Sequence, residues 1–568
     1  MKKNLFFTIL AVIALIACKQ QPLAIQKTSE RGPIGDSAMI VSAHPLATEA
    51  GLEIMRQGGN AFDAAIAVHF ALQVVFPEAG NIGGGGFAVI RNKNGESTTL
   101  DFREKAPKAA SRDMYLDENG DVIPLKSRLG HLAAGVPGSV AGMWALYQEY
   151  GSLPWSDLLI PAIRLAYHGH LLTELAASNL NDAQEDFKKA NKYGTWAIKE
   201  GGWAKGDSSV QRELAATLSF IQNQGRDGFY KGIVADQIVK EMQSGNGLIS
   251  FEDLETYEVK WRQPVTGEYK GHRIISMPPP SSGGVALIQL LQGAERYDFG
   301  KTGHNTSATI HLMTELERRV YADRATYLGD PDYYEVPVAM LLDPEYNKKR
   351  YSDINQKRKT SSEDIKEGKV EIIESVQTTH YSIVDREGNA ISVTTTLNGY
   401  FGCKVMVQGA GFFLNNEMDD FSAKPGIPNM FGLVGAEANA IAPGKRMLSS
   451  MTPTIVEKDN RLFMVTGTPG GATIITSVFQ SILNVIDHGM TMQEAVNAPR
   501  LHSQWLPDII VAEKGRLSEK TQSELEAMGH VIEFRSGLGK VDAILALPDS
   551  TFEGGADYNR GDDYAGGF

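Results

Sequence analysis

Cysteine is nearly absent from this sequence, which contains only Cys18 and Cys403. If Cys18 is modified, as its context predicts below, a single thiol remains and no intramolecular disulfide can form. The fold must then be stabilised by its core. A composition of 42% hydrophobic and 22% charged residues is typical of a packed globular protein and allows a large buried core.

Positive charge is also in short supply. The chain has 55 Lys and Arg against 68 Asp and Glu, a formal net charge of -13. Binding of nucleic acid without regard to its sequence requires clustered Lys and Arg. The densest basic stretch, residues 348–359, is interrupted by Tyr, Ser and Asp, which is typical of a solvated loop. We therefore expect no nucleic-acid partner.

Long hydrophobic runs are missing from the chain after its N-terminal segment. No stretch there reaches the ~20 residues that a membrane-spanning helix needs. At the N-terminus, Lys2 and Lys3 precede an apolar run over residues 5–17, the order of an export signal. The run ends at Leu-Ile-Ala-Cys18, which resembles a bacterial lipobox; the alternative is a plain signal peptide that contains a Cys. We expect a signal peptide over residues 1–17, lipidation of Cys18 and a flexible tether over residues 18–31. The protein would then be exported to the periplasm or cell envelope, with the lipid anchor as its membrane contact.

Two common signatures of cofactor sites are missing as well. The 12 His form no H-E-x-x-H pair and Cys403 has no thiol partner, so we expect no metal site. The glycine run at residues 83–86 is not followed by the Lys-Ser or Lys-Thr of a phosphate-binding loop. We therefore predict a protein without cofactors.

Hydrophobic periodicity predicts strands enclosed by helices. Helical patterns cover residues 46–55, 61–75, 310–327, 473–487 and 492–498, and residues 107–330 as a whole favour helices over a few strands. Strand-like alternation covers residues 87–91, 97–102, 379–385, 390–397, 454–457 and 462–467. This order indicates an α+β fold in which stacked sheets lie between helical layers.

A polar segment precedes the strand at residue 379. Residues 346–377 are rich in Lys, Arg, Ser, Asp and Glu, which predicts an exposed connector that tolerates a chain break. A break before Thr378 would give this residue a hydroxyl nucleophile and a free α-amine, whose reference pKa of ~7.7–8.0 lets it accept the hydroxyl proton near neutral pH. Taken alone, Thr-Thr-His-Tyr-Ser is also an ordinary polar β-strand.

Several long motifs occur in an order that resembles the γ-glutamyltranspeptidase family, and the likeness spans nearly all of the chain after the tether. They are Gly58-Gly59-Asn60-Ala61-Phe62-Asp63-Ala64-Ala65, Gly80 to Phe87, Asp101-Phe102-Arg103-Glu104, Thr378 to Ser382, Asn415-Asn416-Glu417-Met418-Asp419-Asp420-Phe421, Leu448-Ser449-Ser450-Met451 and Gly467-Thr468-Pro469-Gly470-Gly471. The resemblance implies an N-terminal nucleophile hydrolase, a four-layer αββα sandwich.

The resemblance also implies a precursor, or zymogen, that cuts itself between Gln377 and Thr378. The products would be a large subunit, residues 32–377 after the tether, and a small catalytic subunit, residues 378–568. The two would stay together as a heterodimer, because each contributes strands to one core.

The catalytic residues follow from the same resemblance. Thr378 would attack the γ-carbonyl, and the Thr396 hydroxyl would hold the Thr378 amine in place. The backbone amides of Gly470 and Gly471 resemble an oxyanion hole, and glycine lets the backbone come close to the reacting oxygen. Without the family, Pro469-Gly470-Gly471 is an ordinary turn between a strand and a helix.

A γ-glutamyl donor carries an α-carboxylate and an α-ammonium, and a selective site must pair both charges. The Arg103 guanidinium suits the carboxylate, with the hydroxyls of Ser449 and Ser450 donating to the same oxygens. Asp420, helped by Glu417 and the Asn398 carbonyl, suits the ammonium. Taken alone, Arg103 would be a surface ion pair and Asp419-Asp420 a solvated acidic turn.

The stretch from Pro425 to Leu433 resembles a lid loop over the bound glutamyl group, with Gly and Pro at its ends. Many bacterial relatives have a Tyr where this chain has Phe431, and that Tyr hydroxyl latches to the Asn equivalent to Asn398. Phe431 cannot make this hydrogen bond. Residues 556–562 also depart from the usual ending of the family.

We therefore predict an acyltransferase and hydrolase of glutathione metabolism. It would form a γ-glutamyl-enzyme from glutathione or other γ-glutamyl amides and transfer the group to water or to amino acid and dipeptide acceptors. One alternative is a cephalosporin (glutaryl) acylase, whose donor lacks the ammonium that Asp420 and Glu417 would pair. The other is a non-catalytic peptide-binding lipoprotein, which would have no reason to cleave itself.

Overall fold

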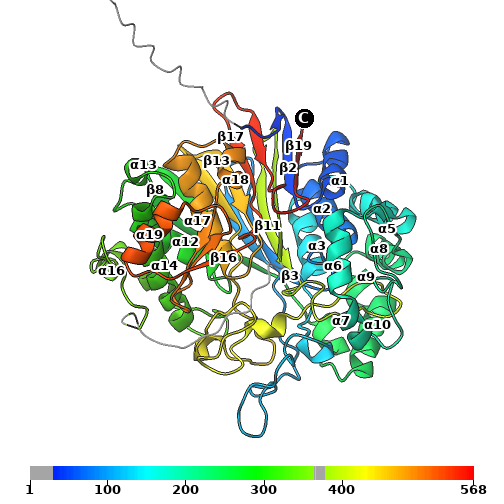
Figure 1. Ribbon diagram of the computed structural model, residues 1–568. Coiled ribbons are helices and arrows are strands. Elements are labelled where there is room, and N and C mark those ends of the chain that lie inside the picture. Colours follow the sequence, from blue (N-terminus) through cyan, green and yellow to red (C-terminus); the bar gives the residue numbers. More distant parts are fainter. Residues whose placement is uncertain (1–29, 364, 366–377) are drawn as a thin grey trace, which may run out of the picture.

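Two β-sheets lie face to face at the centre of the molecule, and helices cover the outer face of each (Figure 1). The computed structural model describes residues 30–363, 365 and 378–568. The predicted signal peptide, the lipidation of Cys18 and the Gln377 side of the cleavage site lie outside these residues. Within them the layers run helix, sheet, sheet, helix, which confirms the αββα expectation.

The first seven-stranded sheet, here called the nucleophile sheet, is antiparallel throughout the described residues. Its strands, in spatial order, are β19 (Tyr564–Gly567), β2 (Ala38–Ser42), β10 (Thr378–Asp385), β11 (Ala390–Thr396), β3 (Gly85–Arg91), β4 (Ser97–Asp101) and β7 (Lys260–Arg262). β10 and β11 are therefore central strands, paired so that Thr378 lies opposite Thr396.

The second sheet, also seven-stranded in the described residues, packs against the first. In spatial order it contains β1 (Ile34–Gly35), β18 (Phe552–Gly555), β17 (Asp542–Ala546), β13 (Arg461–Gly467), β12 (Thr454–Lys458), β9 (His272–Ser276) and β8 (Val265–Tyr269). Arg91 of the first sheet donates to Glu457 of the second over 2.7 Å, and both side chains are buried. This ion pair fastens the two sheets together.

The helices divide between the two outer layers. The nucleophile sheet is covered by α1 (Pro45–Arg56), α2 (Ala61–Val75) and α3 (Ser139–Tyr150), with α4 (Trp155–Leu158), α5 (Ile160–His168), α8 (Arg212–Gln224), α9 (Asp227–Tyr230) and α10 (Gly232–Ser244) outside them. The second sheet is covered by α12 (Gly283–Ala294), α17 (Thr473–Ile486) and α18 (Met492–Asn497), with α14 (Ser307–Tyr327) packed on α12. α2 is buried along its whole length and starts with a capping box between Asn60 and Asp63.

Short elements complete the described chain. They are α6 (Glu174–Asp182), α7 (Gln184–Ala190), α11 (Phe251–Glu255), α13 (Phe299–Thr302), α15 (Val338–Leu341), α16 (Pro344–Arg350), α19 (Glu519–Ala527), β5 (His170–Leu171), β6 (Ser208–Ser209), β14 (Leu501–His502), β15 (Ile510–Glu513), β16 (Ile532–Arg535) and the 3-10 turns His131–Ala133, Glu417–Asp420 and Glu437–Asn439.

Strand alternation decides which side chains face the other sheet. Tyr381 and Ile383 of β10 belong to the core under the helices, whereas Val384 belongs to the core between the sheets. Because side chains alternate along a strand, Thr378, His380 and Ser382 share the inter-sheet face with Val384. The nucleophile candidate therefore points between the two sheets and away from the helices.

The predicted elements are confirmed with one correction. The exposed connector was predicted to start at residue 346, but residues 344–350 form α16, and Asn347 and Tyr351 are buried against α12. Tertiary packing overrides local composition here. The few strands expected before residue 330 include β7, β8 and β9, at residues 260–276.

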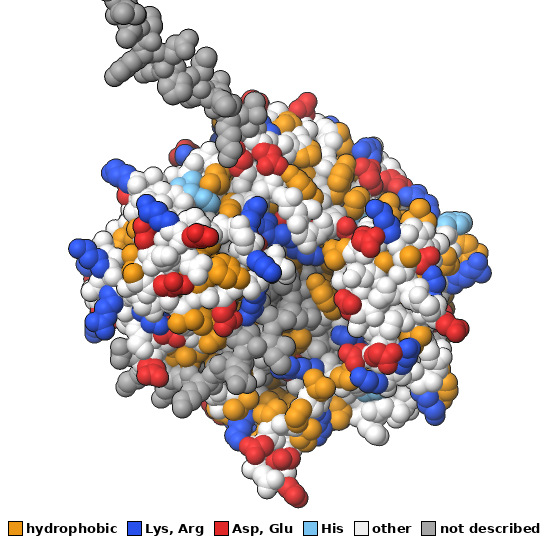
Figure 2. Space-filling model, viewed as in Figure 1, with side chains coloured by type: hydrophobic (Ala, Val, Ile, Leu, Met, Phe, Trp, Pro, Cys, Tyr) orange, Lys and Arg blue, Asp and Glu red, His pale blue; other side chains and the backbone are white. Residues whose placement is uncertain are grey.

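The surface carries charges of both signs without a large patch of either on the face that Figure 2 shows. Among the residues that the structure describes, no helix is both long and apolar enough to cross a bilayer.

Candidate active site

Thr378 begins β10 and lies at the end of the cleft between the two sheets. Its side chain is 7% exposed, and its Oγ1 lies 3.5 Å from Oγ1 of Thr396. The Thr396 hydroxyl accepts in turn from the backbone amide of Asn398 over 2.8 Å. The antiparallel register thus brings together two hydroxyls that are 18 residues apart in the chain.

The glycine run beside these threonines has a steric purpose. A Cβ on Gly84 would lie 2.1 Å from the carbonyl oxygen of Thr396, and a Cβ on Gly83 would lie 2.1 Å from that of Phe413. No side chain fits at these distances, so the run lets the backbone before β3 approach β11. This role accounts for the motif without a phosphate ligand.

Gly470 and Gly471 form a turn just before α17. Both have positive φ, 138° and 54°. Within the described residues, neither amide N–H donates to a backbone carbonyl. These amides lie at the N-terminal end of α17, where the helix dipole favours negative charge. Two unused amides in this position can stabilise an oxyanion.

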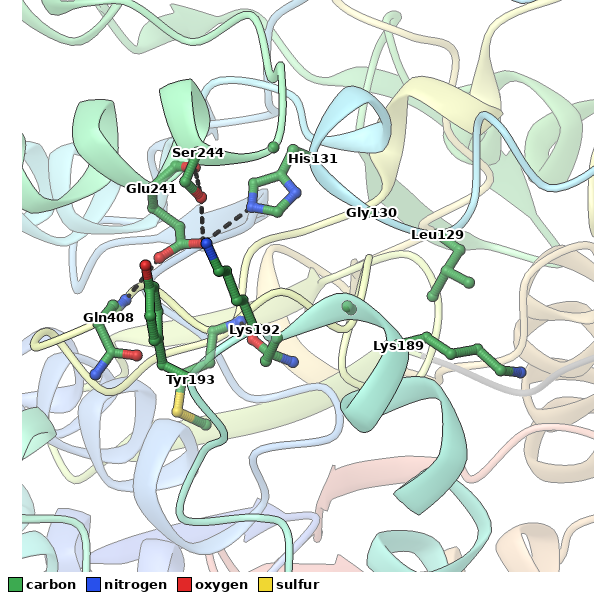
Figure 3. A pocket seen from close by; sticks show the side chains of 13 residues that line it. Leu129, Gly130, His131, Lys189, Lys192, Tyr193, Glu241, Ser244 and Gln408 are labelled. Atoms are coloured by element: carbon green, nitrogen blue, oxygen red, sulfur yellow. Dashed lines mark hydrogen bonds and ion pairs between the residues drawn. The ribbon is translucent and has the colours of Figure 1, made fainter.

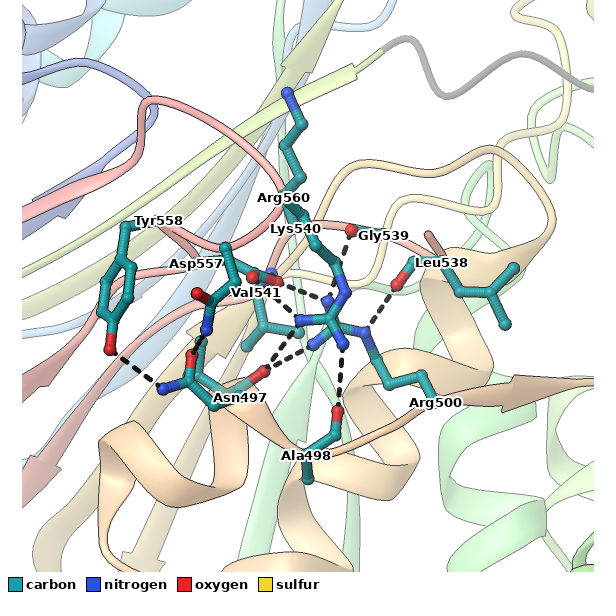
Figure 4. Close-up of polar contacts among 12 residues, drawn as sticks. Asn497, Ala498, Arg500, Leu538, Gly539, Lys540, Val541, Asp557, Tyr558 and Arg560 are labelled. Atoms are coloured by element: carbon teal, nitrogen blue, oxygen red, sulfur yellow. Dashed lines mark hydrogen bonds and ion pairs between the residues drawn. The ribbon is translucent and has the colours of Figure 1, made fainter. Parts of the chain in front are cut away.

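A buried ionic cluster around Arg500 and Asp557 holds the segment at Leu538 and Gly539 (Figure 4). Arg500 is bound to Asp557 and donates to the carbonyl of Leu538 over 2.5 Å and to that of Gly539 over 3.3 Å. Gly539 lies beside Gly470, and a Cβ on Gly470 would be in van der Waals contact with the Gly539 Cα at 3.4 Å. The cluster therefore sets the position of the residues behind the turn.

Arg103 is the central charge of the site and is 1% exposed. It forms ion pairs with Glu417 at 2.7 Å, with Asp420 at 2.6 Å and with Glu104 at 3.5 Å. The residue predicted to bind a carboxylate and those predicted to bind an ammonium thus contact one another. A zwitterionic ligand can replace this contact by pairing each partner with its own opposite charge.

The acids of this cluster outnumber the cation. Burial would lower the pKa of Arg103, but the charges of Glu417, Glu104 and Asp420 raise it, so the guanidinium stays charged. Burial raises the pKa of Asp420, raises that of Glu417 well above its ordinary value, and raises that of Glu104 to about 7. Three carboxyl groups thus surround one guanidinium, and this surplus of acid leaves partners for a ligand ammonium when Arg103 binds a carboxylate.

Ser449 and Ser450 enter the site from the loop before β12 and are 2% and 7% exposed. Ser449 Oγ accepts from the amide of Met451 over 3.1 Å, and Ser450 Oγ accepts from Arg324 over 3.1 Å. Sequence reasoning missed Arg324, which is 5% exposed and lies on α14. The available signal was its place in the periodic helical pattern of residues 310–327.

One small cavity brings most of the predicted residues together. It is lined by Arg103, Thr378, Thr396, Asn398, Glu417, Asp420, Phe431, Leu433, Ser449, Ser450, Met451, Gly471 and Ile474. Gly470 is the one predicted catalytic residue among those described that does not line it. The cavity measures about 20 Å³, room for about one water molecule. A glutamyl group needs more space, so the walls must move to admit it.

The loop at residues 425–433 forms one of these walls. The Phe431 ring lies on Gly471, where a Cβ would be 2.4 Å from its Cδ1. Asn429 accepts the backbone amides of Phe431 and Leu433 and donates to Asp420 Oδ1 over 2.9 Å. The loop is thus tied to the acid predicted to bind the ammonium.

Asn398, the residue to which a Tyr at position 431 would bond, has another partner here. Asn398 Nδ2 donates to the carbonyl of Asn416 over 3.0 Å. The Phe431 backbone carbonyl instead accepts from Gln504 over 3.3 Å. Gln504 was not predicted from the sequence, because nothing local distinguishes it from a core Gln.

A larger cavity of about 600 Å³ lies elsewhere, beside α7 and α10 (Figure 3). Its lining includes Lys189, Lys192 and the ion pair of His131 with Glu241, and none of the predicted site residues. In the part of the chain that the structure describes, no group of three or more His, Cys, Asp or Glu side chains could hold a metal ion.

Known proteins that resemble this chain indicate its family. The family model described as Gamma-glutamyltranspeptidase matches residues 47–567. A curated relative, the glutathione hydrolase proenzyme of Escherichia coli (strain K12), is 46% identical over 533 residues, which cover 93% of this chain and 92% of the relative.

Two solved structures resemble the fold. The cephalosporin acylase from Bacillus halodurans has a TM-score of 0.83 at 26% identity and covers 97% of this chain and 99% of its own. A chain of the Helicobacter pylori gamma-glutamyltranspeptidase has a TM-score of 0.56 at 49% identity and covers 57% of this chain and 94% of its own. The layered architecture is thus shared with both kinds of enzyme.

Proposed function

The chain belongs to the gamma-glutamyltranspeptidase family of N-terminal nucleophile hydrolases, and we propose that Thr378 is the nucleophile through which it removes γ-glutamyl groups from glutathione and related amides. The single observation that carries this proposal is the cavity in which Thr378, a buried cation and a surplus of acid meet. The enzyme is both a γ-glutamyltransferase and a γ-glutamyl hydrolase.

The proposed reaction has two steps. The Thr378 hydroxyl adds to the γ-carbonyl while its proton passes to the α-amine of the same residue, and Thr396 orients that amine. The amides of Gly470 and Gly471 stabilise the oxyanion. The C–N bond then breaks, the leaving amine takes the proton, and a γ-glutamyl ester remains on Thr378. Water or an acceptor amine attacks this ester in the second step and restores the hydroxyl.

Recognition of the donor follows the charges of the pocket. The α-carboxylate pairs with Arg103, and Ser449 and Ser450 donate to its oxygens. The α-ammonium pairs with Asp420 and Glu417, assisted by the Asn398 carbonyl. Both charges of the ligand then replace the contact between Arg103 and the acids.

The surplus of acid also argues against the acylase alternative. A glutaryl donor has the carboxylate but no ammonium, so Asp420 and Glu417 would have no ligand cation to pair with once Arg103 binds the ligand carboxylate. The identity of 46% with a glutathione hydrolase proenzyme, against 35% with the acylase ACY 1 proenzyme of Pseudomonas sp. (strain SE83), supports the same choice.

Maturation by self-cleavage between Gln377 and Thr378 completes the proposal, since the α-amine that acts as the base exists only after this bond is cut. The large subunit would comprise residues 32–377 and the small subunit residues 378–568.

We further propose export by residues 1–17 and a lipid anchor at Cys18 in the periplasm or cell envelope, on the lipobox-like sequence around Cys18. Amino acids and dipeptides are the proposed acceptors beside water.

Replacement of the nucleophile tests the proposal. We expect purified wild type to give two bands on a denaturing gel and to release glutamate from a γ-glutamyl anilide, and Thr378→Ala to give one band and no release. Thr379→Ala is the matched control, because its side chain lies on the opposite face of β10, and it should still be cleaved. Two bands from Thr378→Ala would refute the assignment.

A further inference from the structure

The lid loop, defined as residues 425–433, lacks the Tyr hydroxyl expected in many bacterial relatives, yet Phe431 is buried and only 4% exposed. Its ring has no polar atom, so any hydrogen bond that holds the closed position, beside the apolar packing of the ring, must be made by the lid backbone or by neighbouring side chains. One such contact comes from the segment after β14, where Gln504 Nε2 donates to the carbonyl of Phe431 over 3.3 Å.

Gln504 is held in a defined orientation. It is 5% exposed, and its Oε1 lies 2.9 Å from Nε2 of His502. Because Oε1 can only accept, the His502 proton is on Nε2, and this bond turns the Gln504 NH₂ group toward Phe431. The other ring nitrogen, Nδ1, lies 2.9 Å from the Thr476 hydroxyl, which also lies 3.1 Å from the carbonyl oxygen of Thr473. Burial lowers the pKa of His502 to about 4, so the ring is neutral at pH 7.

The segment that carries Gln504 is rigidly mounted. Gln480 of α17 bonds both the amide and the carbonyl of Leu501, at 3.0 and 2.6 Å. Glu317 of α14 accepts the amide of Ser503 over 3.0 Å. The donor is therefore fixed to the helical layer, whereas the lid on the other side of the bond has no regular secondary structure.

We propose that Gln504 is a positioning residue that latches the lid shut through the Phe431 backbone carbonyl, and that it thereby retains the donor in the γ-glutamyl pocket. The latch acts on the backbone, so it does not depend on a hydroxyl at residue 431. Its second effect is to press the Phe431 ring onto Gly471. The inference rests on the proposed function only for the identity of the retained group.

The test compares two variants that remove the donor, Gln504→Glu and Gln504→Met, with Gln57→Glu as a control at an exposed position away from the lid. Hydrogen exchange of the ligand-free mature protein should rise by about five-fold in residues 425–435 of both Gln504 variants, the factor expected for one lost neutral hydrogen bond. The KM for a γ-glutamyl anilide should rise by a similar factor while kcat changes less than about two-fold, and the control should match wild type.

Unchanged exchange in the lid of either folded variant would overturn the latch, and so would a fall in kcat at constant KM. If neither Gln504 variant matures, Thr476→Val takes their place. Valine has nearly the same volume as threonine but lacks the hydroxyl that contacts His502. Slower or unchanged hydrogen exchange in the lid of Thr476→Val would also overturn the proposal. Faster exchange in a protein that ignores γ-glutamyl donors would support the latch and refute the proposed function, so the two are distinguishable.

Discussion

Single residues decide which ligand the pocket accepts, and Asp420 illustrates this most clearly. One of its oxygens faces Arg103 and the other accepts from Asn429. A ligand ammonium would take the place of Arg103, so the negative charge matters most to donors that carry an ammonium.

We expect Asp420→Asn to lower kcat/KM for a γ-glutamyl anilide by at least about 30-fold, since loss of one partner of a buried charge pair costs about 2 kcal/mol or more. A glutaryl anilide, which has no ammonium, should change less than about three-fold. Parallel kinetics with both substrates check this. Equal losses on the two would contradict the assignment of the ammonium site, and Asp186→Asn on exposed α7 should leave both unchanged.

Glu317 gives the fold a pH dependence at the residue scale. It is buried on α14, and burial raises its pKa from 4.5 to about 8. An acid whose pKa is higher in the folded state stabilises the fold below its unfolded pKa, and this contribution is lost as the pH rises through the folded pKa. Between pH 4.5 and about 8 the folded protein either keeps Glu317 protonated, which the unfolded chain would not, or buries its negative charge, and both lower the free energy of unfolding.

Glu317→Gln should therefore be more stable than wild type at pH 9 and equally stable near pH 4.5, because glutamine is neutral throughout. The gain can reach about 1.4 kcal/mol for each pH unit across the window. Thermal unfolding of both proteins at the two pH values measures it. A loss of Tm that is the same at both values would show that Glu317 is not neutral in the fold.

At the scale of elements, α17 has a positive-φ glycine near each end, and only one of them faces the reaction. Gly471 precedes the helix and lies under the Phe431 ring, whereas Gly489 follows it with φ 61° and open space around it. The backbone conformations are similar, so the two positions separate the effect of strain from that of contact.

We expect Gly471→Ala to lower kcat by about 10²–10³, the loss seen when an oxyanion donor is removed, because the new Cβ would displace the turn or the Phe431 ring. Gly489→Ala should lower stability by about 1–2 kcal/mol through its left-handed backbone and leave kcat within about two-fold. Steady-state kinetics and thermal unfolding of both variants check this, and a normal kcat for Gly471→Ala would exclude that turn from catalysis.

At the scale of the whole molecule, the two predicted subunits are interleaved. In the nucleophile sheet, β10, β11 and β19 follow residue 377, whereas β2, β3, β4 and β7 precede it. The second sheet likewise combines β1, β8 and β9 with strands from the later part. Strand pairs and the buried core therefore join the two parts without the covalent link.

We expect the cleaved protein to elute from a sizing column as one species with the mass of both subunits, at the same volume as uncleaved Thr378→Ala. The subunits should separate only in denaturant, because the strand pairs of both sheets and the shared core must break together. Two peaks in native buffer would contradict the interleaved arrangement.

The sequence alone determined the local features of this protein. Alternation along residues 379–385 and 390–397, the apolar helix at 61–75 and the Gly-Gly turn before α17 depend on neighbours a few residues apart, so they could be predicted. The ligand-binding roles of the motifs around Arg103 and Asp420 could also be predicted, because the resemblance to a family assigns both motifs to one pocket.

Only the tertiary structure decided how distant residues meet. Arg324 and Gln504 approach the site from α14 and from beyond α17, and the pairing of Arg103 with Asp420 joins residues more than 300 positions apart. Composition likewise placed residues 346–350 in a connector, whereas packing against α12 made them a helix. Such contacts depend on how whole layers pack, and burial of a side chain is a property of those layers rather than of its neighbours in the chain.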